Sequence, residues 1–186
     1  MNKAAFHELC ANDDMRPVMS YVFVTRDKVV ATDANVMGWQ DTTDVFNNYE
    51  FERHIPEEGM LIHSEDWKKL HKADGLQWKT EGKVIKILHK KKRDELIEVE
   101  MQSDVGKFPN WEAVVPTDEP IGVPAIGINI DFLSRIGKFY KPLDSTTSIK
   151  MVFSHPNKAI RVSLAKPTDK SFESAKALIM PVMIDN

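Results

Sequence analysis

The same succession of elements occurs twice along this chain of 186 residues, and this repeat constrains the fold more than any single residue does. Each copy has the pattern of a short apolar strand, a basic amphipathic helix and three further strands. The first copy predicts strands at 60–63, 76–80, 83–89 and 95–102 and a helix at 65–73. The second predicts strands at 125–128, 149–154, 159–164 and 175–184 and a helix at 131–140. Two βαβββ units predict an α+β fold with antiparallel sheets and two helices on one face.

The repeat divides the chain into four segments. We expect the two units at 59–115 and 125–186, separated by a connector at 116–124 that contains three prolines and so suits neither a helix nor a central strand. The segment at 1–58 is acidic, with five Lys or Arg against eleven Asp or Glu. Its pattern predicts a helix at 2–10, a hairpin at 18–32, a third strand at 35–39 and a polar loop at 41–58, and it is either a partial unit or an extension.

Both predicted helices have cationic side chains away from their apolar stripes. Residues 63–93 contain ten Lys or Arg against four Asp or Glu, although the net charge of the whole chain is -3. Cations on two helices on one side of a sheet suit a phosphate backbone, because such contacts give affinity without reading sequence. The alternative is an ordinary solvated helix face, since lysine is usually exposed. The candidate DNA-binding residues are Lys68, Lys69, Lys72, Arg135, Lys138 and Lys141.

Motifs for catalysis are absent from the sequence. There is no Gly-rich phosphate loop, nucleophile elbow or HExxH motif, and each adjacent pair of carboxylates fits a helix cap or a solvated loop. His7 and Cys10 have the spacing of two metal ligands, but no second pair completes a tetrahedral site. We therefore expect no catalytic residue, no metal and no cofactor. An enzyme that uses an undetected carboxylate or histidine site is the remaining alternative.

The cellular compartment follows from the cysteine content and from the apolar runs. Cys10 is the only cysteine, which excludes an internal disulfide and fits a reducing compartment. No apolar run approaches membrane-spanning length, and the N-terminus lacks the pattern of a secretory signal. We expect a cytoplasmic protein that does not engage a membrane.

Three segments, in order along the chain, resemble those of one known family. Residues 30–37 (VATDANVM) are similar to the family's VATDGHRL segment. Residues 106–111 (GKFPNW), followed by Val115-Pro116, are similar to its G-R-F-P-D-Y…LP stretch. Residues 178–184 (LIMPVMI) are similar to its VVMPMRL segment. On these segments and the duplicated unit, the chain resembles a truncated, divergent member of the bacterial DNA polymerase III beta subunit family, the sliding clamps.

The resemblance implies a DNA-clamp-like fold whose sheets form the outside of a ring and whose helices face duplex DNA. It implies a non-enzymatic accessory protein of DNA replication or repair. It also matches five of the cationic residues above to DNA-facing positions, namely Lys68, Lys69, Lys72, Arg135 and Lys138. The alternative is a clamp-fold protein–protein interaction module that neither encircles nor binds DNA.

The family also has an apolar pocket that captures short peptides from polymerases and clamp loaders. The matching positions here are Thr32, Ala34, Asn35, Val36, Met37, Leu178, Met180, Pro181 and Met183. The alternative is that these positions belong to the core, because buried Met and Leu are common.

The chain departs from the family pattern in two ways. Ala34, Asn35 and Val36 replace the family's Gly, His and Arg, so we expect a different peptide preference. A full clamp subunit has six units, whereas this chain has two and a partial third. A single chain cannot encircle DNA, so a ring would have to be a homo-oligomer of several copies.

Overall fold

The computed structural model describes residues 4–12, 15–46, 55–72, 78–81, 84–89, 95–100, 105–119, 122, 126–143, 148–155 and 157–182. Most of the described strands belong to one seven-stranded antiparallel sheet with the order β4-β1-β2-β3-β10-β9-β8. These strands are β1 (Tyr21–Val24), β2 (Lys28–Thr32), β3 (Val36–Asp41), β4 (Met60–His63), β8 (Ile149–Val152), β9 (Ile160–Leu164) and β10 (Lys176–Ile179).

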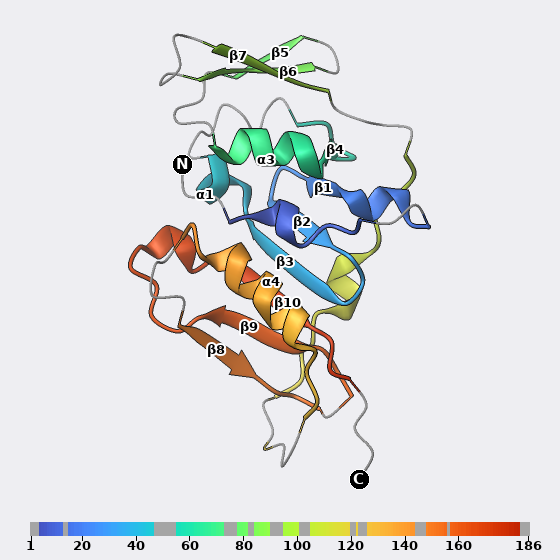
Figure 1. Cartoon of the computed structure of the whole chain (residues 1–186), viewed down its shortest axis with the longest axis vertical. Coiled ribbons are helices and arrows are strands. Elements are labelled where there is room, and N and C mark those ends of the chain that lie inside the picture. The colour runs from blue at the N-terminus through green and yellow to red at the C-terminus, as the bar shows by residue number, and fades with distance from the viewer. Residues whose placement is uncertain are drawn as a thin grey trace.

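The centre of this sheet joins the two ends of the chain. β3 pairs with β10 in antiparallel register, with Val36 opposite Ile179 and Trp39 opposite Lys176. The N-terminal meander β1–β2–β3 and the C-terminal meander β8–β9–β10 therefore form one continuous sheet (Figure 1). The strands β1, β2 and β3 of segment 1–58 therefore lie between β4 and β10 in this sheet.

A second, three-stranded sheet contains β5 (Trp78–Glu81), β6 (Val84–His89) and β7 (Glu95–Glu100), paired as an antiparallel meander. It follows helix α3 (Ser64–Lys72), and β7 contacts that helix. The first predicted unit is thus divided between the sheets, since β4 pairs with β1 in the large sheet.

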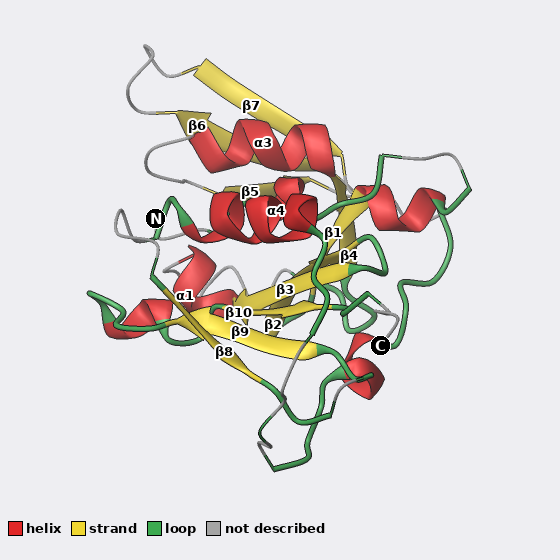
Figure 2. Ribbon diagram, turned by 60° about the horizontal axis from the view of Figure 1, so that its bottom comes forward, coloured by secondary structure: helices red, strands yellow, loops and turns green. Residues whose placement is uncertain are grey.

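The helices α3 and α4 (Ile130–Tyr140) lie on the same side of the seven-stranded sheet (Figure 2). A short 3-10 helix, η1 (Phe6–Glu8), contacts both. Phe6 packs edge-on against Trp67 of α3 and Phe139 of α4, with ring centroids 5.5 and 5.2 Å away. Burial of these aromatic rings stabilises the layer, because aromatic side chains remove the most apolar area from water. Alternate residues of the strands complete this core, among them Val22, Val24, Val29, Ala31, Ile62, Ile160, Val162 and Ile179.

The opposite face of the sheet has a smaller apolar cluster that includes Val30, Met37, Leu61 and Leu178. Residues 105–115, which contain the 3-10 helix η3 (Trp111–Val114), pack against this cluster. The ring of Phe108 stacks on Phe23 at 4.9 Å, and that of Trp111 lies 5.6 Å from Trp39. Residues 105–115 therefore cover part of the outer face of the sheet, the face opposite α3 and α4.

The α+β class, the antiparallel sheets and the two helices on one face are confirmed. The expected loop at 41–58 is wrong at its start, because α1 (Thr42–Phe46) forms there and buries Val45 and Phe46. The expected helix at 2–10 is reduced to η1 among the described residues.

Other predicted boundaries also shift. The strand at 125–128 is represented by one bridge between Gly127 and Val182, and the hairpin at 18–32 begins with the 3-10 helix η2 (Pro17–Ser20). The loop before β10 contains η4 (Lys170–Phe172), which Asp169 caps through the backbone N–H of Ser171. In the described part of the chain, no helix has the length and apolarity needed to cross a bilayer.

Candidate functional site

The exposed face of α3 presents lysines that are paired with acids on the same helix. Trp67 and Leu70 point into the core, which leaves Lys68 and Lys69 exposed. The Nζ atom of Lys68 lies 4.0 Å from Glu65, and that of Lys69 lies 2.5 Å from Asp66. Exposed pairs of this spacing stabilise a helix only slightly, so a phosphate group can replace the acid as partner. The side chain of Lys72 lies outside the described part.

The exposed face of α4 presents two further lysines near its C-terminal end. Lys138 is exposed and its Nζ lies 3.5 Å from the carboxylate of Glu8. Lys141 caps the helix, and no ion pair of Lys141 is found among the residues that the structure describes. Cations here also interact favourably with the negative end of the helix dipole.

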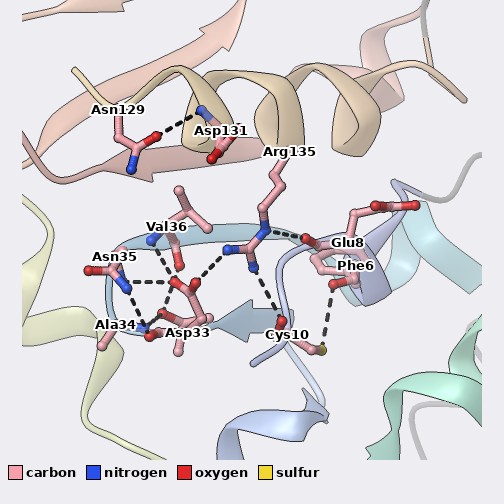
Figure 3. Close-up of polar contacts among 11 residues, drawn as sticks. Phe6, Glu8, Cys10, Asp33, Ala34, Asn35, Val36, Asn129, Asp131 and Arg135 are labelled. Carbon is pink, nitrogen blue, oxygen red and sulfur yellow. Dashed lines mark hydrogen bonds and ion pairs between the residues drawn. The ribbon is translucent and has the colours of Figure 1, made fainter. Parts of the chain in front are cut away.

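Arg135 differs from the lysines, because its side chain points into the protein. Nε donates to the carbonyl of Glu8 at 2.7 Å, and one terminal nitrogen donates to the carbonyl of Cys10 at 3.2 Å. The other terminal nitrogen pairs with Asp33 (Figure 3). Only 23% of the side chain is exposed, and its guanidinium is bound to acceptors of this chain. We had expected this side chain to face DNA.

Asp33 lies at the turn between β2 and β3 and organises it. One carboxylate oxygen accepts the backbone N–H groups of Asn35 at 2.8 Å and Val36 at 2.9 Å, while the other accepts from Arg135. Burial on its own raises the pKa of Asp33, but these hydrogen bonds outweigh it and hold the pKa below its ordinary value. The carboxylate is therefore charged at neutral pH and buried with its partner.

The predicted peptide-binding positions divide into buried and exposed residues. Those with side chains in the core are Thr32, Val36, Met37 and Leu178. The more accessible ones are Ala34, Asn35, Met180 and Pro181, whereas Met183 lies outside the described residues. The accessible positions meet at one place, because the backbone N–H of Met180 donates to the carbonyl of Asn35 at 2.9 Å.

Sequence reasoning missed several residues of this region. Asp33 and Glu8 hold Arg135 and Lys138, and Val182 is exposed beside Met180, with 43% of its surface accessible. The Asp-Ala-Asn order at 33–35 is the signal that could have identified Asp33, since aspartate caps its own turn. No local signal pointed to Glu8, because its contact is made across the fold.

The described residues contain no group of three or more His, Cys, Asp or Glu placed to hold a metal ion. Cys10 is buried, and burial raises the pKa of its thiol to about 12. A thiol with that pKa is protonated at neutral pH and a poor nucleophile.

Comparison with known proteins gives a match at the level of structure. No protein-family model and no curated protein sequence matches the chain. The fold is similar to the DNA polymerase III beta chain of Streptococcus pneumoniae (TM-score 0.64, 15% identity, 98% of this chain and 61% of that chain). It is also similar to the DNA polymerase III subunit beta of Borrelia burgdorferi (TM-score 0.67, 13% identity, 99% of this chain and 60% of that chain). A third similar structure is the DNA polymerase sliding clamp of Bacillus subtilis (TM-score 0.60, 14% identity, 99% of this chain and 61% of that chain).

These comparisons confirm the resemblance in fold: the chain has the sliding-clamp fold. The chain spans about three fifths of the length of the clamp structures that it matches. At these identities the likeness concerns the fold alone.

Proposed function

We propose that this protein is a non-catalytic, clamp-fold accessory protein of cytoplasmic DNA replication or repair that contacts duplex DNA through its helix face. We define the helix face as the exposed cations Lys68, Lys69, Lys138 and Lys141. The observation that carries the proposal is that two helices lie on one side of the sheet (Figure 2), bury their apolar stripes against it and leave these lysines exposed.

The ion pairs on the helix face set the expected strength of binding. Three of the four lysines already have a carboxylate partner, so each phosphate contact replaces an exposed pair that contributes little stability. Binding then gains its free energy mainly from counterion release and weakens steeply as salt rises. We expect weak binding that is independent of sequence and detectable at low ionic strength.

The test is a double charge reversal, Lys68→Glu with Lys138→Glu, which changes one lysine on each helix. We expect affinity for a labelled duplex to fall at least tenfold at 50 mM salt, and the slope of log affinity against log salt to fall by about two, since two phosphate contacts are removed. The matched control is Lys150→Glu with Lys176→Glu. Both of these lysines alternate with inward-facing residues of β8 and β10 and therefore lie on the outer face of the sheet.

Equal losses in the two double variants would contradict the proposal, because they would show that net charge and not the helix face decides binding. Sedimentation of the wild type with and without duplex measures whether copies assemble on DNA. Encircling a duplex requires such an assembly.

The exposed residues that follow β10 favour a second candidate function, the capture of a short peptide from a polymerase or clamp loader. Met180 and Val182 are 38% and 43% exposed. The backbone N–H of Met180 donates to Asn35 of the turn at 33–36, and that of Val182 donates to Gly127. A protein with this surface and no affinity for DNA would be an interaction module. Peptide binding by a chain that ignores duplex DNA at 50 mM salt would select this function over the first.

A further inference from the structure

Arg135 joins three segments that are far apart in the sequence. From α4, its guanidinium reaches two backbone carbonyls of the N-terminal segment, those of Glu8 and Cys10, and the carboxylate of Asp33 on the β2–β3 turn (Figure 3). A planar guanidinium offers donors in fixed directions, so it can hold several acceptors in one arrangement. The pairing with Asp33 is mostly buried, with 23% of the Arg135 side chain and 11% of the Asp33 side chain exposed.

The carboxylate of Asp33 transmits this constraint to the turn. The oxygen that does not meet Arg135 accepts the N–H groups of Asn35 and Val36. Ala34 between them has φ of 76°, in the left-handed region that a residue with a side chain adopts at a cost. The turn therefore depends on the orientation of the Asp33 carboxylate, which Arg135 holds.

The β2–β3 turn also holds the residues that follow β10. The carbonyl of Asn35 accepts the N–H of Met180, and two residues later the N–H of Val182 donates to the carbonyl of Gly127, both at 2.9 Å. Gly127 lies just before Asn129, which caps α4 through the N–H of Asp131. The contacts thus form a closed path from α4 through the turn and residues 180–182 back to α4.

We propose that Arg135 is a positioning residue for the partner-binding surface of this protein and not a DNA contact. We name this surface the turn–β10 surface; it consists of Ala34, Asn35, Met180, Pro181 and Val182. Its occupant is a short apolar peptide, which suits the exposed Met180 and Val182. The inference therefore rests on the second candidate function above. Arg135 acts through Asp33. If the turn is loosened, peptide binding must also order the turn, and the lost conformational entropy lowers the affinity.

The experiment compares Arg135→Met with Lys138→Met, which removes an exposed cation three residues further along the same helix. The probes are a fluorescein-labelled ten-residue peptide from the clamp-binding region of a bacterial replicative polymerase, and a labelled duplex. For Arg135→Met we expect peptide affinity to fall roughly tenfold, as is typical when one site is coupled to another, with an unchanged salt slope for DNA. Lys138→Met should show the reverse, a lower salt slope for DNA and wild-type peptide affinity.

Two further variants separate positioning from general stability. Leu164→Ala destabilises the core at the C-terminal end of β9. The other end of that strand, at Ile160, is the one that pairs with Ile179 of β10. We expect it to lower Tm at least as much as Arg135→Met while leaving peptide affinity unchanged below Tm. Arg135→Lys keeps the charge but cannot reach three acceptors, so we expect it to bind the peptide as weakly as Arg135→Met.

The outcomes are distinguishable. Equal peptide affinity of wild type and Arg135→Met overturns the inference alone, and so does an equal loss in Leu164→Ala. A DNA salt slope that falls by about one in Arg135→Met identifies a phosphate contact and also overturns it. A wild type that does not bind the peptide overturns the second candidate function, and this inference with it.

Discussion

At the residue scale, the turn between β2 and β3 combines strain with dense hydrogen bonding. Ala34 is exposed and has φ of 76°, while Thr32 accepts the N–H of Ala34 at 3.0 Å and donates to the carbonyl of Val36 at 2.9 Å. A left-handed conformation costs a residue with a Cβ about 1–2 kcal/mol. The hydrogen bonds of Thr32 and Asp33 offset this cost. The position therefore suits glycine, which the clamp family segment has there.

Ala34→Gly tests this strain. Glycine adopts the left-handed region without a steric penalty, and the exposed Ala34 side chain loses little packing when it is removed. We expect the free energy of unfolding to rise by about 0.5 kcal/mol, because relief of strain exceeds the added entropy of the unfolded chain. Urea titration measures it. The control is Ala113→Gly in η3, an exposed alanine without positive φ, which should be neutral or destabilising; a loss at both positions would contradict the argument.

At the same scale, the sequence could identify which residues are charged but not which way they point. The apolar spacing of α4 placed Arg135 away from the stripe of Ile136 and Tyr140, and its inward contacts appear only once the N-terminal segment and the β2–β3 turn are packed beside the helix. Partners of Arg135 lie 102 to 127 residues away in sequence. No local pattern encodes such a contact.

At the element scale, the link between α4 and the β2–β3 turn should be sensitive to acid. The pKa of Asp33 is lower in the folded protein than in the unfolded chain. The unfolded chain therefore binds the proton more readily, and the stabilisation is present above the unfolded pKa of about 3.9 and lost as pH falls through the folded pKa.

Asp33→Asn tests this linkage. We expect the variant to have a lower Tm than wild type at pH 7, because it leaves Arg135 without its buried counter-charge, and the gap should close as pH falls below about 4. Scanning calorimetry from pH 7 to pH 2.5 measures the gap. Asp118→Asn serves as the control, since the pair of Asp118 with Lys158 lies on the surface and contributes little. A gap that stays constant with pH would show that the Asp33 charge is unimportant.

Elements with a strong period were predictable, and short or irregular ones were not. The helix predicted at 131–140 forms at Ile130–Tyr140, and the strand predicted at 60–63 forms at those residues, because one apolar stripe and one apolar run defined them. α1 has five residues and too few turns to show a period. Its helical conformation comes from burial of Val45 and Phe46 against the sheet, which is a tertiary effect.

At the scale of the whole molecule, the fold depends on β3, where the N-terminal and C-terminal strands pair and where η1 and α4 pack on the sheet. The sequence predicted two units but could not reveal that the N-terminal meander would pair with the C-terminal one, since strand pairing at long range leaves no local signal. Gly38 lies on β3 opposite Ala177 of β10, at the point where η1 and α4 approach the sheet. A Cβ there would lie 2.6 Å from Leu9 and 2.8 Å from Phe139.

Gly38→Ala should therefore weaken the whole layer. Phe139 is fully buried against Phe6 and Tyr140, so it cannot move aside without disturbing the core, and we expect a loss of about 1–3 kcal/mol in unfolding free energy by urea titration. The matched control is Gly137→Ala on α4, where a Cβ would meet no atom within 4 Å; it should stabilise by about 0.5–1 kcal/mol, because alanine favours the helix. If Gly38→Ala were neutral, β3 would not be the closely packed junction of the strands, η1 and α4. Because the helix face and the turn–β10 surface are both built on this junction, the same variant should weaken DNA and peptide binding together, whereas charge changes on the helix face should affect only DNA.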